Sequence, residues 1–263
     1  MRTQAFKLAH RLLQALVLTA TLSVLALSPL RAQSGGDAAG VEPLRIAVFG
    51  ASGRVGSRIV TEALSRGHFV TGVGRDVERL TESHPHFSKV EGDVTDSASV
   101  ATIVPGHDAV VSAIGGSNPD SDDPTDSIPV QAATALITAL RDLGPSAPRI
   151  IFVGGGSTTL QSSPGVYLDD PTDVPEGARA ARIFGHRVVL ETLSGISDLR
   201  WTFFSPALQM RPGERTGVFR VGGSLVLRDA NGESAISMED FAVATIDELE
   251  HPRHIGRQTT VAY

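Results

Sequence analysis

Three glycines near the start of the chain have the spacing of a phosphate-binding turn. Gly50, Gly53 and Gly56 lie in "FGASGRVG", directly after the apolar run "LRIAVF". Glycine lets a backbone turn tightly and approach a ligand closely, and the N–H groups that begin a helix attract anions. The stretch therefore predicts a backbone site for a phosphate group. The alternative is a plain tight turn between a strand and a helix.

The segments around the glycines predict the elements that would hold them. Residues 45–50 predict a buried strand and residues 55–67 a helix. Further strands are expected at 68–75, 87–94, 107–116, 148–156 and 199–207, and helices at 130–144 and 178–195. Strands that alternate with helices predict a parallel sheet with right-handed crossovers. The expected fold class is α/β: a Rossmann-like doubly wound parallel sheet with helices on both faces, formed by residues 41–263 as one domain.

The last part of the chain is expected to add a small C-terminal extension on the substrate side. β-like segments at 217–229 precede a helix at 237–251, and a last strand is expected at 257–263. Ser237 is the predicted N-cap of that helix, with Asp240 three residues on.

The place of the glycines in this order favours a dinucleotide over a plain turn. They follow the first strand of a βαβ series, where a pyrophosphate meets the start of a helix. Gly50 is then expected to permit the turn, Gly53 the approach of the phosphate, and Gly56 the packing of helix on strand. Ser52 and Val55 of the same turn complete the expected cradle.

Two arginines predict the kind of dinucleotide. Arg75 stands at the end of the second expected strand, where an NAD site would have Asp or Glu, and Arg54 lies within the glycine turn. Guanidinium groups suit a 2′-phosphate. NADP is therefore favoured, with NAD as the alternative if Arg75 is only a solvated surface residue.

Several segments resemble the atypical short-chain dehydrogenase/reductase family. They are "VFGASGRVG", "EGDVTD", "VVSAIG", "RIIFVGGGS" and "WTFFSPA". The resemblance covers about residues 44–263 and is closest to the NADH-flavin reductase branch, which is related to biliverdin reductase B and NmrA-like proteins. It implies the following cofactor contacts: Asp93 and Val94 at the adenine, Ala113, Ile114 and Gly115 along the middle, and Pro206 and Ala207 near the nicotinamide.

The usual Tyr-x-x-x-Lys pair of that superfamily cannot form here. Residues 41–263 contain one lysine, Lys89, and two tyrosines, Tyr167 and Tyr263. Pro171 stands four residues after Tyr167, and the resemblance places Arg187 at the lysine position and Ile183 at the tyrosine position. Oxidation of an alcohol or epimerisation of a sugar would need such a positioned acid and base.

A flavin acceptor removes that need, because hydride can pass directly between the two rings and solvent can supply the proton. The predicted function is therefore an NAD(P)H-dependent reductase of a flavin or another planar small-molecule acceptor. The alternatives are an NADP-binding redox sensor without turnover, as in NmrA-like proteins, and, less favoured, a nucleotide-sugar epimerase or dehydratase.

Two side chains are candidates to assist catalysis. Ser157 follows "VGGG" where the superfamily keeps a serine, with a loop or helix-cap hydroxyl as the alternative. His186 lies on the expected helix 178–195 and could donate a proton; the alternative is a packing or surface histidine. The Pro- and Asp-rich stretch 162–177 is either a lid over the acceptor or a plain surface loop.

The first forty residues have the layout of a secretory signal. A basic start, an apolar run ending in Ser-Pro and Ala32 as a cleavage site precede the linker "SGGDAAG". Export to the periplasm is expected, with no stable membrane anchor after cleavage. The alternatives are a retained anchor and a cytoplasmic protein that starts at Val41.

Composition excludes several other functions. Without residues 1–40 the chain keeps 19 basic and 28 acidic side chains, a formal charge of −9. Such a domain is a poor partner for nucleic acid, which is bound by neutralising phosphates. The chain has no cysteine, so disulfides and thiol catalysis are excluded, and its histidines have no ligand spacing, so no metal is expected. The oligomeric state is left open.

Overall fold

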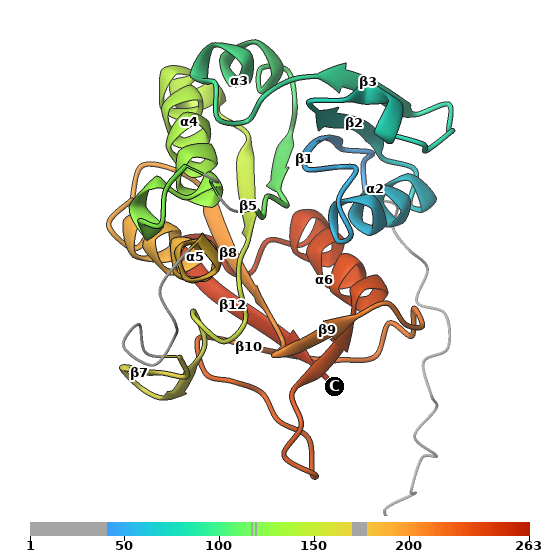
Figure 1. The fold of residues 1–263 in the computed structure, drawn as a ribbon. Helices are drawn as coiled ribbons and strands as arrows, with labels where there is room; N and C mark the ends of the chain where they lie inside the picture. The colour runs from blue at the N-terminus through green and yellow to red at the C-terminus, as the bar shows by residue number, and fades with distance from the viewer. Residues whose placement is uncertain (1–40, 117, 119, 170–177) are drawn as a thin grey trace, which may run out of the picture. The chain divides into compact units, whose positions relative to one another are not determined.

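An eight-stranded, mostly parallel sheet forms the centre of residues 41–263 (Figure 1). The computed structural model describes residues 41–116, 118, 120–169 and 178–263. The sheet order is β10-β12-β8-β5-β4-β1-β2-β3, and β10 pairs antiparallel with β12. Its strands are β1 (Arg45–Phe49), β2 (Phe69–Gly74), β3 (Phe87–Glu91), β4 (Ala109–Ser112), β5 (Arg149–Val153), β8 (Trp201–Pro206), β10 (Arg220–Gly222) and β12 (Arg257–Ala262).

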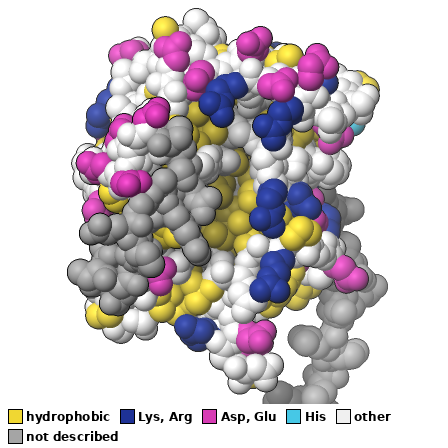
Figure 2. Space-filling view, in the orientation of Figure 1, with side chains coloured by type: hydrophobic (Ala, Val, Ile, Leu, Met, Phe, Trp, Pro, Cys, Tyr) yellow, Lys and Arg dark blue, Asp and Glu magenta, His cyan; other side chains and the backbone are white. Residues whose placement is uncertain are grey.

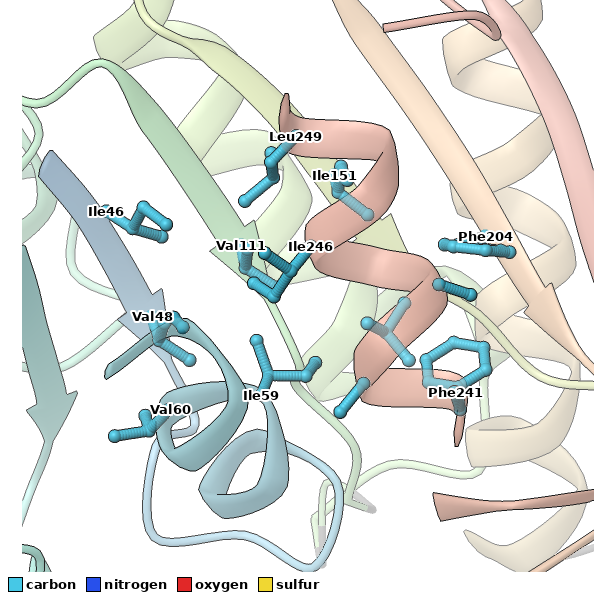
Figure 3. Close-up of a cluster of buried hydrophobic side chains, with 14 of the residues drawn as sticks. Ile46, Val48, Ile59, Val60, Val111, Ile151, Phe204, Phe241, Ile246 and Leu249 are labelled. Atoms are coloured by element: carbon cyan, nitrogen blue, oxygen red, sulfur yellow. The ribbon is translucent and has the colours of Figure 1, made fainter. Parts of the chain in front are cut away.

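Helices cover both faces of the sheet, which explains why the middle strands are buried along their whole length. All residues of β4, β5 and β8 are buried. One core joins the sheet to α2 (Gly56–Ser65) and α6 (Met238–Glu250), and Figure 3 shows their side chains gathered with Val48, Val111 and Ile151. A second core lies under α3 (Ser97–Ile103), α4 (Ile128–Asp142) and α5 (Ala178–Ser194). The predicted doubly wound α/β fold is confirmed.

Two features of the fold were not predicted. Helix α3 is short and half polar, and begins where Asp96 accepts the N–H of Ala98 at 3.0 Å. Two small sheets also lie beside the main one: β9 (Gln209–Arg211) with β11 (Ala235–Ser237), and β6 (Gln161–Ser163) with β7 (Val166–Tyr167). The second takes up part of the expected loop 162–177, whose residues 170–177 lie outside the described residues.

The predicted start of the C-terminal helix is confirmed, because the hydroxyl of Ser237 accepts the N–H of Asp240 at 2.9 Å. Within the described part of the chain, no helix has the length and apolar character to cross a membrane. The expected signal segment, residues 1–40, lies outside that part.

Candidate active site

A cavity of about 950 Å³ opens at the carboxyl ends of the parallel strands. Its walls take residues from the ends of β1 to β5, around the point between β1 and β4 where the order of strands reverses. Ligands of doubly wound sheets bind at this kind of point. Figure 2 shows a hollow floored by hydrophobic side chains, with Lys and Arg side chains beside it.

The glycine turn follows β1 and forms one wall. Gly50 has a φ of +81°, and a Cβ atom there would come within 2.6 Å of the carbonyl oxygen of Ala113. The N–H of Gly53 donates to the carbonyl oxygen of Gly50 at 2.9 Å, which closes the turn. A Cβ atom on Gly56 would overlap that same oxygen, so α2 rests directly on the end of β1. Gly50 and Gly53 line the cavity, whereas Gly56 packs behind them.

The start of α2 presents free backbone donors to the cavity. Its N-cap, Val55, makes no side-chain capping bond. Among the described residues, the N–H groups of Arg54 and Val55 have no acceptor, and both residues line the cavity with Ser52. Unpaired N–H groups and the helix dipole together form a site for an anion such as a diphosphate.

Positive charge surrounds the end of the cavity beside β2 and β3. Arg54, Arg75 and Arg79 line it, and all three are exposed. Asp93 lies among them: hydrogen bonds from the N–H and hydroxyl of Thr95, with a smaller contribution from Arg75, hold the pKa of its carboxyl below the usual range. This end therefore combines guanidinium donors for a phosphate with two carboxyl groups, those of Asp76 and Asp93.

The predicted contacts after β3 and β4 lie along the same cavity. Asp93 and Val94 line it near the arginines, and Ala113, Ile114 and Gly115 line its middle. Pro206 and Ala207 do not line it. They pack instead against the turn that follows β5, where their carbonyl oxygens lie 3.1 Å from the position that a Cβ atom on Gly156 would take.

The opposite end of the cavity is apolar. It is lined by residues from five separate segments: Ile128, Val153, Gly154, His186, Met210 and Met238. Among the described residues at this end there is no Asp, Glu, Lys or Arg. Met210 and Met238 are the chain's only methionines besides Met1. Thioethers pack well against aromatic rings, so this end suits the face of a planar molecule.

The two candidate catalytic residues have different surroundings. His186 lines the cavity, and its Cδ2 atom lies 3.5 Å from where a Cβ atom on Gly155 would be. Ser157 does not line the cavity; its carbonyl oxygen accepts the N–H of Asp169 at 3.2 Å. The structure thus brings His186, but not Ser157, to the apolar end.

Arg187, at the position of the family's lysine, holds the chain after β5. Its Nε donates to the carbonyl oxygen of Thr158 at 2.7 Å, and its Nη2 to that of Asp169 at 2.5 Å. Its guanidinium lies 4.0 Å from the centre of the Tyr167 ring. No tyrosine or lysine is among the described residues that line the cavity, and no described group of His, Asp and Glu could hold a metal ion.

Comparison with known proteins agrees with this geometry. A model of the NAD(P)H-binding family matches residues 50–252, and the chain therefore belongs to that family. It has the Rossmann fold typical of NAD(P)H-binding oxidoreductases.

Three solved structures are similar over nearly their whole length. A Burkholderia pseudomallei protein named "putative exported protein" is 39% identical, with a TM-score of 0.70, over 84% of this chain and all of that one. A Bacteroides thetaiotaomicron "putative epimerase" is 36% identical, with a TM-score of 0.74, over 84% and 98%. A Streptococcus pneumoniae "putative NADH-flavin reductase" is 28% identical, with a TM-score of 0.69, over 83% and 99%.

Proposed function

We propose that the protein is a reductase that transfers a hydride from NADPH to a flavin or another planar acceptor. The observation that carries this proposal is the polarity of one cavity, with arginines at one end and two methionines at the other. Between them lies a helix start with unpaired N–H groups. The name of the Streptococcus pneumoniae relative, "putative NADH-flavin reductase", supports a flavin as the acceptor.

Each part of the cavity then has a role in binding. Arg75 and Arg54 bind the 2′-phosphate, Asp93 and Val94 flank the adenine, and the N–H groups of Arg54 and Val55 hold the diphosphate. Ala113, Ile114 and Gly115 support the middle of the cofactor. Reduced nicotinamide supplies the hydride.

The apolar end positions the acceptor and excludes water. Met210, Met238 and Ile128 pack against its ring system, which keeps the two reacting rings in contact. His186 is the one described side chain at this end that can donate a proton. Because a reduced flavin can also take its proton from solvent, His186 assists the reaction and is not required for it.

The activity test is loss of nicotinamide absorbance when purified protein, NADPH and FMN are mixed. We expect turnover that depends on the protein and is faster with NADPH than with NADH. Tight NADPH binding without turnover on any of several acceptors would instead favour the redox sensor, which a cavity without tyrosine or lysine also allows. Conversion of a nucleotide sugar would favour the epimerase.

We also propose that the chain is exported. Residues 1–40 have the layout of a signal, and the Burkholderia pseudomallei relative is named as exported. Mass spectrometry of the native N-terminus tests this proposal. A peptide that contains "QSGGDAAG" excludes a start at Val41. A native chain that begins with methionine in place of Val41, as initiation at a valine codon gives, contradicts export.

A further inference from the structure

The carboxylate of Glu239 joins two segments that line different parts of the cavity. Glu239 is the second residue of α6, and its Oε1 atom accepts a hydrogen bond from Nε of Arg58 on α2 at 2.6 Å. Its Oε2 atom accepts the N–H of Gly213 at 2.7 Å. Both carboxylate oxygens are therefore in use, each by a different part of the chain.

Arg58 continues this connection to the glycine turn. Its Nη1 atom donates to the carbonyl oxygen of Arg54 at 2.7 Å. A peptide unit is planar, and its C=O and N–H point in opposite directions. Holding the oxygen of Arg54 therefore fixes the direction of the N–H of Val55, which is one of the unpaired donors at the start of α2.

The other oxygen of Glu239 fixes the apolar end. Gly213 comes two residues after β9, which carries Met210, and Met238 directly precedes Glu239. Both methionines line the cavity. The Glu239 carboxylate is thus linked through Arg58 to the glycine turn, which carries the proposed diphosphate donors. It is also bonded directly to the segment after β9, which forms the wall for the proposed acceptor.

The ion pair is charged at neutral pH. Burial raises the pKa of the Glu239 carboxyl, but hydrogen bonds from Arg58 and Gly213 outweigh burial and keep that pKa below its ordinary value of 4.5. An ionised acceptor makes stronger hydrogen bonds than a neutral one.

We propose that Arg58 and Glu239 are positioning residues, which orient the N–H of Val55 toward the diphosphate of the cofactor and fix the acceptor wall relative to it. The inference rests on the proposed function for the identity of the two ligands. It differs from a purely structural role for the pair, in which α2 and α6 are held together without any effect on ligand orientation.

The test compares a ligand that contains the diphosphate with one that lacks it. Glutamine at position 239 carries no negative charge and has one acceptor oxygen in place of two, so Glu239→Gln weakens the bond to the Arg58 guanidinium whichever way the amide is oriented. We expect calorimetry to show NADPH bound about tenfold more weakly. Binding of 2′-AMP, which has the 2′-phosphate and adenine but no diphosphate, should be unchanged. Equal weakening of both ligands, or of neither, would overturn the proposal.

Two variants of Arg58 separate positioning from loss of folding. Arg58→Met should weaken NADPH binding as Glu239→Gln does, and the double variant should bind no more weakly than Arg58→Met alone, because both changes break the same connection. Arg58→Lys, which can reach Glu239 or the Arg54 oxygen but not both, should restore part of the affinity. Additive losses in the double variant would contradict a shared role.

The matched control is the ion pair of Arg141 and Asp198, whose atoms lie 2.8 Å and 3.1 Å apart and outside the cavity. Asp198→Asn should leave both affinities unchanged. If the wild-type protein binds neither NADPH nor NADH, the proposed function fails. If it binds NADPH and Glu239→Gln binds it equally well, the proposed function stands and the positioning role fails.

Discussion

The carbonyl oxygen of Gly50 lies so close to Gly56 that any Cβ atom at position 56 would overlap it. The same oxygen accepts the N–H of Gly53 at 2.9 Å. The end of β1, the turn and the first residue of α2 are therefore held around one atom. A change at this contact should affect the fold and the cavity wall together.

Gly56→Ala tests that relationship. The methyl group must push α2 away from the turn, so we expect the free energy of unfolding to fall by about 1–3 kcal/mol and NADPH affinity to fall with it. Urea unfolding and calorimetry measure the two effects. Gly223→Ala is the control, because a Cβ atom there meets nothing within 4 Å, and its stability should stay within about 0.5 kcal/mol of wild type. Equal effects of the two substitutions would contradict the interpretation.

Arg75→Asp should change the choice of cofactor. A carboxylate repels a 2′-phosphate and accepts hydrogen bonds from a free ribose, so we expect the ratio of NADPH to NADH affinity to fall by about tenfold or more. Binding titrations with both dinucleotides give the ratio. Arg141→Ala, which removes an arginine outside the cavity, should leave it unchanged. An unaltered ratio in Arg75→Asp would show that this arginine does not contact the cofactor.

Met210→Ala should affect the acceptor more than the cofactor. Loss of the thioether removes contact surface at the apolar end, and we expect KM for FMN to rise about tenfold while the Kd for NADPH stays constant. Steady-state kinetics and calorimetry separate the two constants. Val218, whose side chain is 75% exposed and outside the cavity, offers Val218→Ala as the control. A weaker Kd for NADPH with an unchanged KM for FMN would place the acceptor elsewhere.

Tyr167 and Arg187 should prove structural. The ring of Tyr167 stacks on the guanidinium of Arg187 outside the cavity, so Tyr167→Phe should leave kcat unchanged. Arg187→Met removes two hydrogen bonds to backbone carbonyl oxygens and should lower the free energy of unfolding by about 1–3 kcal/mol. A large loss of kcat in Tyr167→Phe, without loss of stability, would indicate that Tyr167 acts as a catalytic acid.

Stability in acid should depend on Asp240, which is fully buried. Burial raises the pKa of its carboxyl, but hydrogen bonds from Thr216, Gly217 and Tyr263 outweigh this and lower it from the ordinary value of 3.8. Because the folded-state pKa is depressed, the stabilisation is complete above 3.8 and is lost as the pH falls through the folded-state value. Asp240→Asn should be less stable at neutral pH and lose less stability in acid. Parallel pH profiles of urea unfolding would contradict this.

Local sequence predicted the elements well, and it selected many of the residues that the structure brings together at one end of the cavity. Each strand from β1 to β4 is followed within two residues by one of these positions: the glycine turn, Arg75, Asp93 and Ala113. Because the carboxyl ends of parallel strands meet at one edge of the sheet, predicting the strands also predicts that these residues lie together. Helix α3 was not predicted because it is only seven residues long and begins with small residues, two of them serines. Its only buried residues are Val100 and Ile103, too few to show a helical repeat of apolar residues.

Apart from His186, the apolar end of the cavity could not be predicted in the same way. Ile128, His186, Met210 and Met238 come from segments separated by many residues, and only tertiary packing brings them together. The one available signal was that residues 41–263 hold two methionines. Ser157 was a candidate because it follows β5, where the superfamily keeps a serine; it does not line the cavity, and its carbonyl oxygen accepts the N–H of Asp169.

The direction of β1 also determines how the domain can be immobilised. Arg45 begins this strand, at the end opposite to the cavity, while Tyr263 donates its hydroxyl to Asp240 and its N–H to Ala235. We therefore expect a support attached at residue 41, in a chain that lacks residues 1–40, to leave the cavity open. Attachment through the carboxyl terminus would instead act on Tyr263, whose hydroxyl is bonded to Asp240 of α6. Helix α6 also carries Glu239, so the position of that carboxylate would be affected as well.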